Sequence, residues 1–208
     1  VLVLIAVAMC VLRIYITRAD GDVFLSRPEG SIATFRLTAM SVGVIVGCAL
    51  AVSGVLLQAL LRNPLAEPFI LGISSGAGLG VMAAMYIAYL RHGLGAGGEE
   101  RLTPAIIGAL LTLALVYLLG QRRGWLDPVS LVLVGVIVSA VCGAGIMFFQ
   151  HLVDTGLRSQ FTLWLMGYIP ESVNVWAFRA SAIIALVGLI VGVVMGRAMD
   201  AATLGDDE

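Results

Sequence analysis

Long apolar stretches alternate with short polar segments along this chain of 208 residues. A helix needs about 20 predominantly apolar residues to cross the hydrocarbon core of a bilayer. Four stretches reach that length without a charged residue, and two further apolar stretches, one near each end of the chain, are shorter. The pattern predicts six membrane-spanning helices, approximately at 1–16, 37–61, 69–90, 102–121, 128–149 and 176–197.

The predicted fold class follows from the lipid environment that apolar stretches of this length occupy. Lipid offers no hydrogen-bond partners to the backbone, so a spanning segment must satisfy its own N–H and C=O groups, as a helix does. We therefore predict an all-α, polytopic integral membrane protein with one transmembrane domain over 1–208. The first apolar stretch is too short to span alone and shows no signal-peptide pattern. We interpret it as a span without its beginning, and expect an incomplete domain.

The segment 62–68, Arg-Asn-Pro-Leu-Ala-Glu-Pro, separates two of the predicted spans. Its two prolines disfavour helix on both sides, because proline lacks an N–H group and restricts the residue before it. This pattern predicts a tight turn at a membrane surface. Glycines then recur at every fourth position, which places them on one helix face and permits close approach of another backbone. They are Gly72, Gly76 and Gly80, and a second such series is Gly188, Gly192 and Gly196.

One connection contains a shorter helical pattern. Residues 157–167 alternate apolar and polar positions at helical spacing and end at Gly167, a residue that commonly terminates helices. This pattern predicts a short amphipathic helix that lies at the interface or dips toward a pore. Trp164 and Trp176 suit the headgroup region, where aromatic residues are enriched.

Composition supports a membrane protein and excludes several functions. The chain is 60% hydrophobic and 12% charged, against about 25% charged in soluble domains. Its net charge of −1 argues against nucleic-acid binding, which needs a basic face. The three cysteines lie in apolar stretches without metal-ligand or disulfide spacing, and the two histidines are far apart. No acidic residue interrupts a span, which disfavours a proton-driven carrier. We predict no catalytic residue, cofactor or metal site.

Several motifs, taken together, resemble a known family of permeases. The chain is similar to the permease subunits of bacterial ATP-binding-cassette (ABC) importers for iron chelates (siderophores), haem and cobalamin, from residue 36 onward. The motifs that carry the resemblance are Arg36-Leu37, Gly47, 51–54, 58–60, 63–68, 71–72, 76–80, 134–136, 164–167 and 203–208.

The resemblance implies a fold of ten helices, of which this chain carries six, and a multi-pass location in the bacterial inner membrane. It implies a homodimer with a second permease copy, two ATPase subunits on the cytoplasmic side and a separate substrate-binding protein outside. ATP hydrolysis would belong to the partner, so this chain would not be an enzyme. The arginines on the two predicted faces do not decide the orientation. The resemblance places the short connections, including 62–68, in the cytoplasm.

Site residues are implied by the same resemblance. Asn63 and Leu65 match residues that narrow the cytoplasmic end of the transport pathway, and Pro128 with Val129 matches a second constriction. Pathway-lining positions would be Gly135, Ser139, Gly143 and Gly167. For each position, helix packing or capping is the alternative interpretation.

Arg36 would face outward and pair with a carboxylate of the docked binding protein. The family often has a second arginine three residues later, where this chain has Ala39. Arg27 or Arg158 could compensate for it.

From the sequence we predict a permease subunit that moves a metal chelate, specifically an iron siderophore, across the bilayer into the cytoplasm. The alternative is a non-transporting scaffold or half-size regulator with the same fold. An ion-driven carrier is a third, weaker interpretation.

Overall fold

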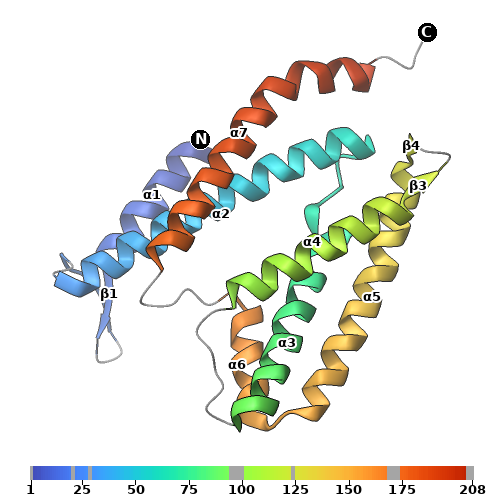
Figure 1. The fold of residues 1–208 in the computed structure, drawn as a ribbon. Helices are drawn as coiled ribbons and strands as arrows, with labels where there is room; N and C mark the ends of the chain where they lie inside the picture. The colour runs from blue at the N-terminus through green and yellow to red at the C-terminus, as the bar shows by residue number, and fades with distance from the viewer. Residues whose placement is uncertain are drawn as a thin grey trace. The chain divides into compact units, whose positions relative to one another are not determined.

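Helices make up most of the protein, as the computed structural model shows for residues 2–19, 22–27, 30–93, 101–122, 125–167 and 174–204 (Figure 1). Two short antiparallel hairpins, β1–β2 and β3–β4, lie in the connections. The prediction of an all-α polytopic fold is confirmed. In chain order the elements are α1 (Leu2–Tyr15), β1 (Ile16–Ala19), β2 (Asp22–Leu25), α2 (Gly30–Leu61), the 3-10 helix η1 (Pro68–Leu71), α3 (Ile73–His92), α4 (Leu102–Leu119), β3 (Gln121–Arg122), β4 (Trp125–Leu126), α5 (Pro128–Leu152), α6 (Thr155–Leu165) and α7 (Val175–Leu204).

Five helices in the described ranges are long and apolar enough to cross a membrane, namely α2, α3, α4, α5 and α7. The helix α1 is apolar but shorter. Its 14 residues extend roughly 21 Å at 1.5 Å per residue, less than the hydrocarbon core of about 30 Å. Five of the six predicted spans therefore correspond to helices long enough to cross a bilayer, and the boundaries of the spans stay predictions.

The helix α2 begins at Gly30, ahead of the predicted start at 37. Its first turns contain Ser31, Thr34 and Arg36, which interrupt the apolar pattern without interrupting the helix. Thr34 donates a hydrogen bond from Oγ1 to the carbonyl of Gly30, so this polar side chain is satisfied by the helix itself. Hydropathy identifies the residues suited to lipid, whereas backbone hydrogen bonding decides where the helix begins.

Contacts divide the chain into two units. The first comprises Val1–Val52 with Ile169–Val193, and the second comprises Ser53–Tyr168 with Val194–Glu208. In the first unit, the β1–β2 hairpin pairs Ile16 with Leu25 at its base, and Ser26 N donates to the carbonyl of Tyr15 at 2.9 Å. This hairpin occupies part of the segment 17–36, which the hydropathy pattern had assigned to a connection.

In the second unit, α3 packs against both α4 and α5. Gly76 and Gly80 face Gly108 on α4 so closely that an added Cβ at Gly108 would lie 2.2 Å from the Gly76 carbonyl oxygen. The predicted close packing of this glycine face is confirmed for these two residues. Gly72 differs, because it precedes α3 in the left-handed conformation and faces α5.

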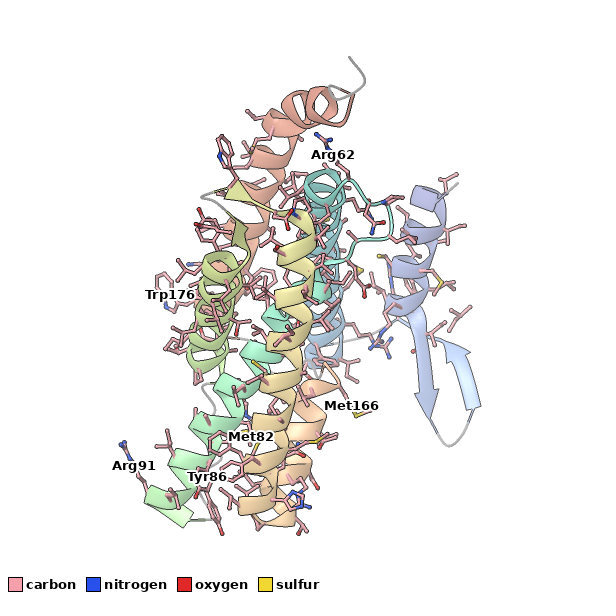
Figure 2. All side chains as sticks on the ribbon, turned by 90° about the vertical axis from the view of Figure 1, so that its right-hand side faces the viewer. Arg62, Met82, Tyr86, Arg91, Met166 and Trp176 are labelled. Carbon is pink, nitrogen blue, oxygen red and sulfur yellow. The ribbon has the colours of Figure 1, made fainter. Side chains whose placement is uncertain are left out.

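Two apolar clusters form the core of the second unit. In one, Met82 of α3 and Phe161 of α6 are fully buried, with the Tyr86 ring 5.3 Å from that of Phe149 (Figure 2). In the other, α4 and α5 bury Val116, Leu131, Val138 and Cys142.

The predicted short helix at 157–167 is present as α6. It ends through Met166 N and Gly167 N, which donate to the carbonyls of Thr162 and Trp164, with Gly167 at φ 83°. Leu157 and Phe161 are buried in the first core cluster, so one face of the helix packs inside the unit.

Candidate functional site

The turn after α2 has a defined hydrogen-bond pattern. Arg62 N donates to the carbonyl of Ala59, and Asn63 N donates to the carbonyl of Gln58 at 3.1 Å. This pair of bonds is the Schellman arrangement, in which the residue after the helix adopts a left-handed conformation. Arg62 does so with φ 47°, although glycine usually occupies this position. The helix therefore stops abruptly, and its last carbonyls are satisfied.

Asn63 shapes the turn with its side chain. Its Oδ1 accepts from Leu65 N at 2.9 Å, while its carbonyl accepts from Ala66 N at 3.1 Å. Gln58 Nε2, from the last turns of α2, donates to the carbonyl of Ala66. Ala66 is thereby buried, whereas the Leu65 side chain between them is 85% exposed. The Leu65 side chain therefore points outward, while the backbone before and after it is held by hydrogen bonds.

The next residues attach this turn to α5. An added Cβ at Gly135 would lie 2.5 Å from the carbonyl oxygen of Ile70 in η1, and one at Gly72 would lie 2.7 Å from Ser139 Oγ. Ser139 Oγ donates to the carbonyl of Gly135 at 2.8 Å, so its polarity is satisfied within the helix. Gly135 lies against η1, and Ser139 lies against Gly72. Their role in lining a pathway stays a prediction.

The start of α5 carries the second predicted constriction. Asp127 is the N-cap, and its Oδ2 accepts from Ser130 N at 2.9 Å and from Ser130 Oγ. Pro128 follows at the first helical position, where a missing N–H leaves no bond unmade. Val129 is 75% exposed. As at Leu65, an outward apolar side chain stands next to a firmly capped backbone.

These two positions lie at the same end of the second unit. The turn 62–72 precedes α3, and β3–β4 with Asp127 follows α4, which runs back antiparallel to α3. Arg62 lies at one end of the unit and Arg91, at the far end of α3, lies at the other (Figure 2). The structure thus brings the four predicted gate residues to one end of the helices.

The remaining predicted positions lie elsewhere. Gly143, midway along α5, is half-buried, and no other described atom lies within 4 Å of a Cβ built there. Gly167 is exposed and open at the end of α6. At both positions, the described residues place no second element against the glycine.

Arg36, whose role in docking a binding protein stays a prediction, contacts α1 in the structure. In the first unit its side chain is buried, and Nη1 donates to the carbonyl of Ile14 in the last turn of α1 at 2.6 Å. A cation at a helix C-terminus is favoured by the partial negative charge of the terminal carbonyls. In the structure Arg36 therefore joins α1 to α2, and its predicted pairing with a binding protein would need this contact to change.

Two supporting features escaped the sequence reasoning. The motif Asp127-Pro128-x-Ser130 is a recognisable helix start, with an N-cap acid followed by proline at the first helical position. The bond from Gln58 to Ala66 had no local signal, because it joins residues across the turn. In the described part of the chain, no group of three or more histidine, cysteine or acidic residues could hold a metal ion.

Comparison with known proteins assigns the chain to a family. The FecCD transport family matches residues 1–208. The chain belongs to this family. It is accordingly a multi-pass membrane protein whose relatives include permease subunits.

Curated relatives of this FecCD-family chain differ in the cargo that their names state. It is 36% identical over 83% of its length to a hemin transport permease, HmuU, of Yersinia pestis, covering 51% of that protein. It is 34% identical over 99% of its length to a vitamin B12 import permease, BtuC, of Vibrio vulnificus, covering 61%. It is 34% identical over 66% of its length to a molybdate import permease, MolB, of Haemophilus influenzae, covering 39% of that protein.

A solved structure agrees with this assignment. It is an inward-facing conformation of a metal-chelate type ABC transporter, with a TM-score of 0.75 and 27% identity, covering 99% of this chain and 62% of the other. The chain spans between about 40% and 60% of the length of the relatives it matches.

Proposed function

We propose that this chain belongs to the transmembrane permease subunit of an ATP-binding-cassette importer that moves a metal chelate, specifically an iron siderophore, into the cytoplasm. The proposal includes two ATPase subunits, a substrate-binding protein, a second permease copy and a place in the bacterial inner membrane. Hydrolysis would be carried out by the ATPase partner. Family membership supports the assignment as a permease subunit. The three relatives described above are named for hemin, vitamin B12 and molybdate, so the siderophore rests on the resemblance alone and stays a proposal.

The observation that carries the proposal is the exposed Leu65 side chain on a turn whose backbone is held by hydrogen bonds. Its backbone is held by Asn63 Oδ1 and by the Schellman bonds at Arg62, and the following segment is attached to α5 at Gly135. A gate must keep its shape when closed and move as one piece when opened. A side chain on a rigidly hydrogen-bonded turn that is docked on a neighbouring helix suits both requirements.

In the proposed mechanism, ATP binding by the partner moves the cytoplasmic ends of the helices. The turn at Asn63 and Leu65, together with Pro128 and Val129, would alternately close and open the inner end of the pathway between two copies. Because η1 packs on α5 at Gly135, a displacement of α5 would carry the turn with it. Gly135, Ser139, Gly143 and Gly167 would line the pathway beyond this constriction.

A transport assay tests the proposal. The full-length permease is reconstituted in liposomes with its ATPase subunits and binding protein, and uptake of a radiolabelled iron siderophore is measured. We expect uptake that needs ATP and persists when the proton gradient is collapsed. No uptake under ATP, or uptake that disappears with the proton gradient, would overturn the assignment.

The gate is tested separately in the same liposomes, loaded with chelate. We expect Leu65→Ala to raise the ATP-independent leak, because removing the side chain widens the constriction. The matched control is Leu90→Ala, an exposed leucine near the other end of α3. Equal leak from both variants would contradict the role of Leu65 while leaving ATP-driven uptake intact.

A further inference from the structure

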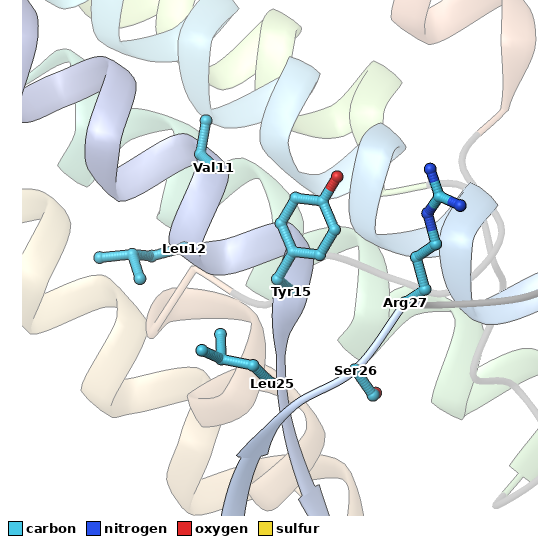
Figure 3. Close-up of a pocket in the computed structure, with 6 residues that line it drawn as sticks. All are labelled: Val11, Leu12, Tyr15, Leu25, Ser26 and Arg27. Atoms are coloured by element: carbon cyan, nitrogen blue, oxygen red, sulfur yellow. The ribbon is translucent and has the colours of Figure 1, made fainter.

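A groove lies at the base of the β1–β2 hairpin in the first unit (Figure 3). Its volume is about 330 Å³, and it is lined by Val11, Leu12, Tyr15, Leu25, Ser26 and Arg27. The last turns of α1 form one side, and the end of β2 with the two residues after it forms the other. The bond from Ser26 N to the carbonyl of Tyr15 joins the two sides of the groove at its base.

The lining has two chemically different sides. In Figure 3 the Tyr15 hydroxyl and the Arg27 guanidinium extend in the same direction, while the side chains of Leu12 and Leu25 extend away from them. Leu25 is 71% exposed and Tyr15 is 40% exposed. One side of the groove therefore presents a cation with a hydroxyl group, and the other presents apolar surface that is not covered within the unit.

The place of the groove along the chain indicates its surroundings. It lies where the apolar helix α1 ends and before the membrane-spanning helix α2 begins, which is the depth of a membrane surface. Tyrosine is enriched at that depth because its ring is apolar and its hydroxyl is polar. Arginine binds phosphate oxygens well, because its planar guanidinium presents several N–H donors at once.

We propose that this groove binds an anionic phospholipid. Its phosphate would accept hydrogen bonds from Arg27 and from the Tyr15 hydroxyl, and one acyl chain would lie along Leu12, Leu25 and Val11. The charge of Arg27 favours an anionic headgroup over a zwitterionic one, and the apolar side distinguishes a lipid from a free anion. The proposal is independent of the cargo and of the transport mechanism.

Lipid retention by the full-length permease tests the proposal. The protein is purified in mild detergent and given equal amounts of phosphatidylglycerol and phosphatidylcholine with identical chains. The bound lipids are then counted by native mass spectrometry. We expect preferential retention of phosphatidylglycerol, and Arg27→Gln should lower the ratio of the two lipids about five-fold, the effect of one surface cation.

Matched variants and a competing anion decide between explanations. Arg91→Gln removes an exposed arginine at the end of α3, outside the groove, and should leave the lipid ratio unchanged. Tyr15→Phe keeps the ring and should lower the ratio less than Arg27→Gln does. Equal retention of both lipids by the unaltered protein, an equal fall in Arg91→Gln, or displacement of phosphatidylglycerol by inorganic phosphate would each overturn the proposal.

Discussion

The two units of this protein bury their helices to very different extents. In the second unit, 28% of the residues in the most apolar 18-residue stretch of α3 are buried. The glycines of this helix contact another backbone. The helix α7 contributes most of its length to the first unit. In its most apolar 18-residue stretch, none of the residues is buried. Yet both helices carry glycines at every fourth position. A glycine face permits close approach but does not supply the partner.

The glycines of α7 illustrate the point. A Cβ at Gly192 would lie 3.1 Å from Val52 Cγ1, while no described neighbour lies within 4 Å of one at Gly188. By contrast, the glycines of α3 meet Gly108, so two small residues lie opposite each other. Close packing in lipid depends on such complementary pairs, because the hydrophobic effect does not drive helices together there.

The largest expected effect concerns the core of the second unit. Phe161→Ala removes a fully buried ring that packs 6.0 Å from the ring of Trp164, and should lower the free energy of unfolding by about 3–5 kcal/mol. The control is Ile184→Ala on the exposed face of α7. Unfolding of both full-length variants in detergent, followed by tryptophan fluorescence, measures the difference. Similar losses would mean that the two units do not differ as described.

A second prediction compares the two glycine series directly. Gly108→Ala places a Cβ against the Gly76 carbonyl oxygen and should destabilise the protein by about 2–3 kcal/mol, because two backbones must separate. Gly188→Ala has open space and should be neutral or stabilising by up to about 1 kcal/mol, since alanine favours helix more than glycine. Thermal unfolding of the two variants provides the measurement. The same shift in both would show that the contact with α4 has no special weight.

The smallest expected effect concerns the first unit, where no described apolar side chain is buried and Arg36 joins two helices by a charged hydrogen bond. Arg36→Met leaves the Ile14 carbonyl without its charged donor and should cost about 1.5 kcal/mol of unfolding free energy. Arg179→Met, at an exposed arginine near Trp176, should change stability by less than about 0.5 kcal/mol. If Arg36→Met unfolds like the unaltered protein but loses binding-protein affinity, its docking role outweighs the contact with α1.

Much of the fold could be predicted because membrane helices are recognisable from local sequence. Apolar length alone located α4, α5 and α7, and Gly167 located the end of α6. The helix predicted at 69–90 begins only at Ile73, because Pro68–Leu71 form a 3-10 helix and Gly72 adopts a left-handed conformation. The start of α2 was placed too late, because Arg36 looked like a residue outside lipid and instead lies buried against α1. From the sequence alone, a polar residue near a helix end that faces water cannot be distinguished from one that donates to a backbone carbonyl.

The candidate site was predicted less completely. The exposed positions of Leu65 and Val129 agree with residues at a constriction, but the gating role itself stays a prediction. Gly135 contacts η1 and Ser139 contacts Gly72, while their role in lining a pathway stays a prediction. Glycine and serine in a membrane helix suit close packing and a hydrated pathway equally well, so their type could not distinguish the two.

The amino-acid sequence by itself determined that this is a helical membrane protein. It also determined where the turns lie and which helix faces carry small residues. These properties follow from hydropathy, proline and glycine, which act within a few residues along the chain. Only the tertiary structure decided that Gly76 meets Gly108, that η1 rests on Gly135 and that Arg36 binds the end of α1. Each of these contacts joins residues far apart in the chain, and local preferences do not specify which distant partner a helix face will meet.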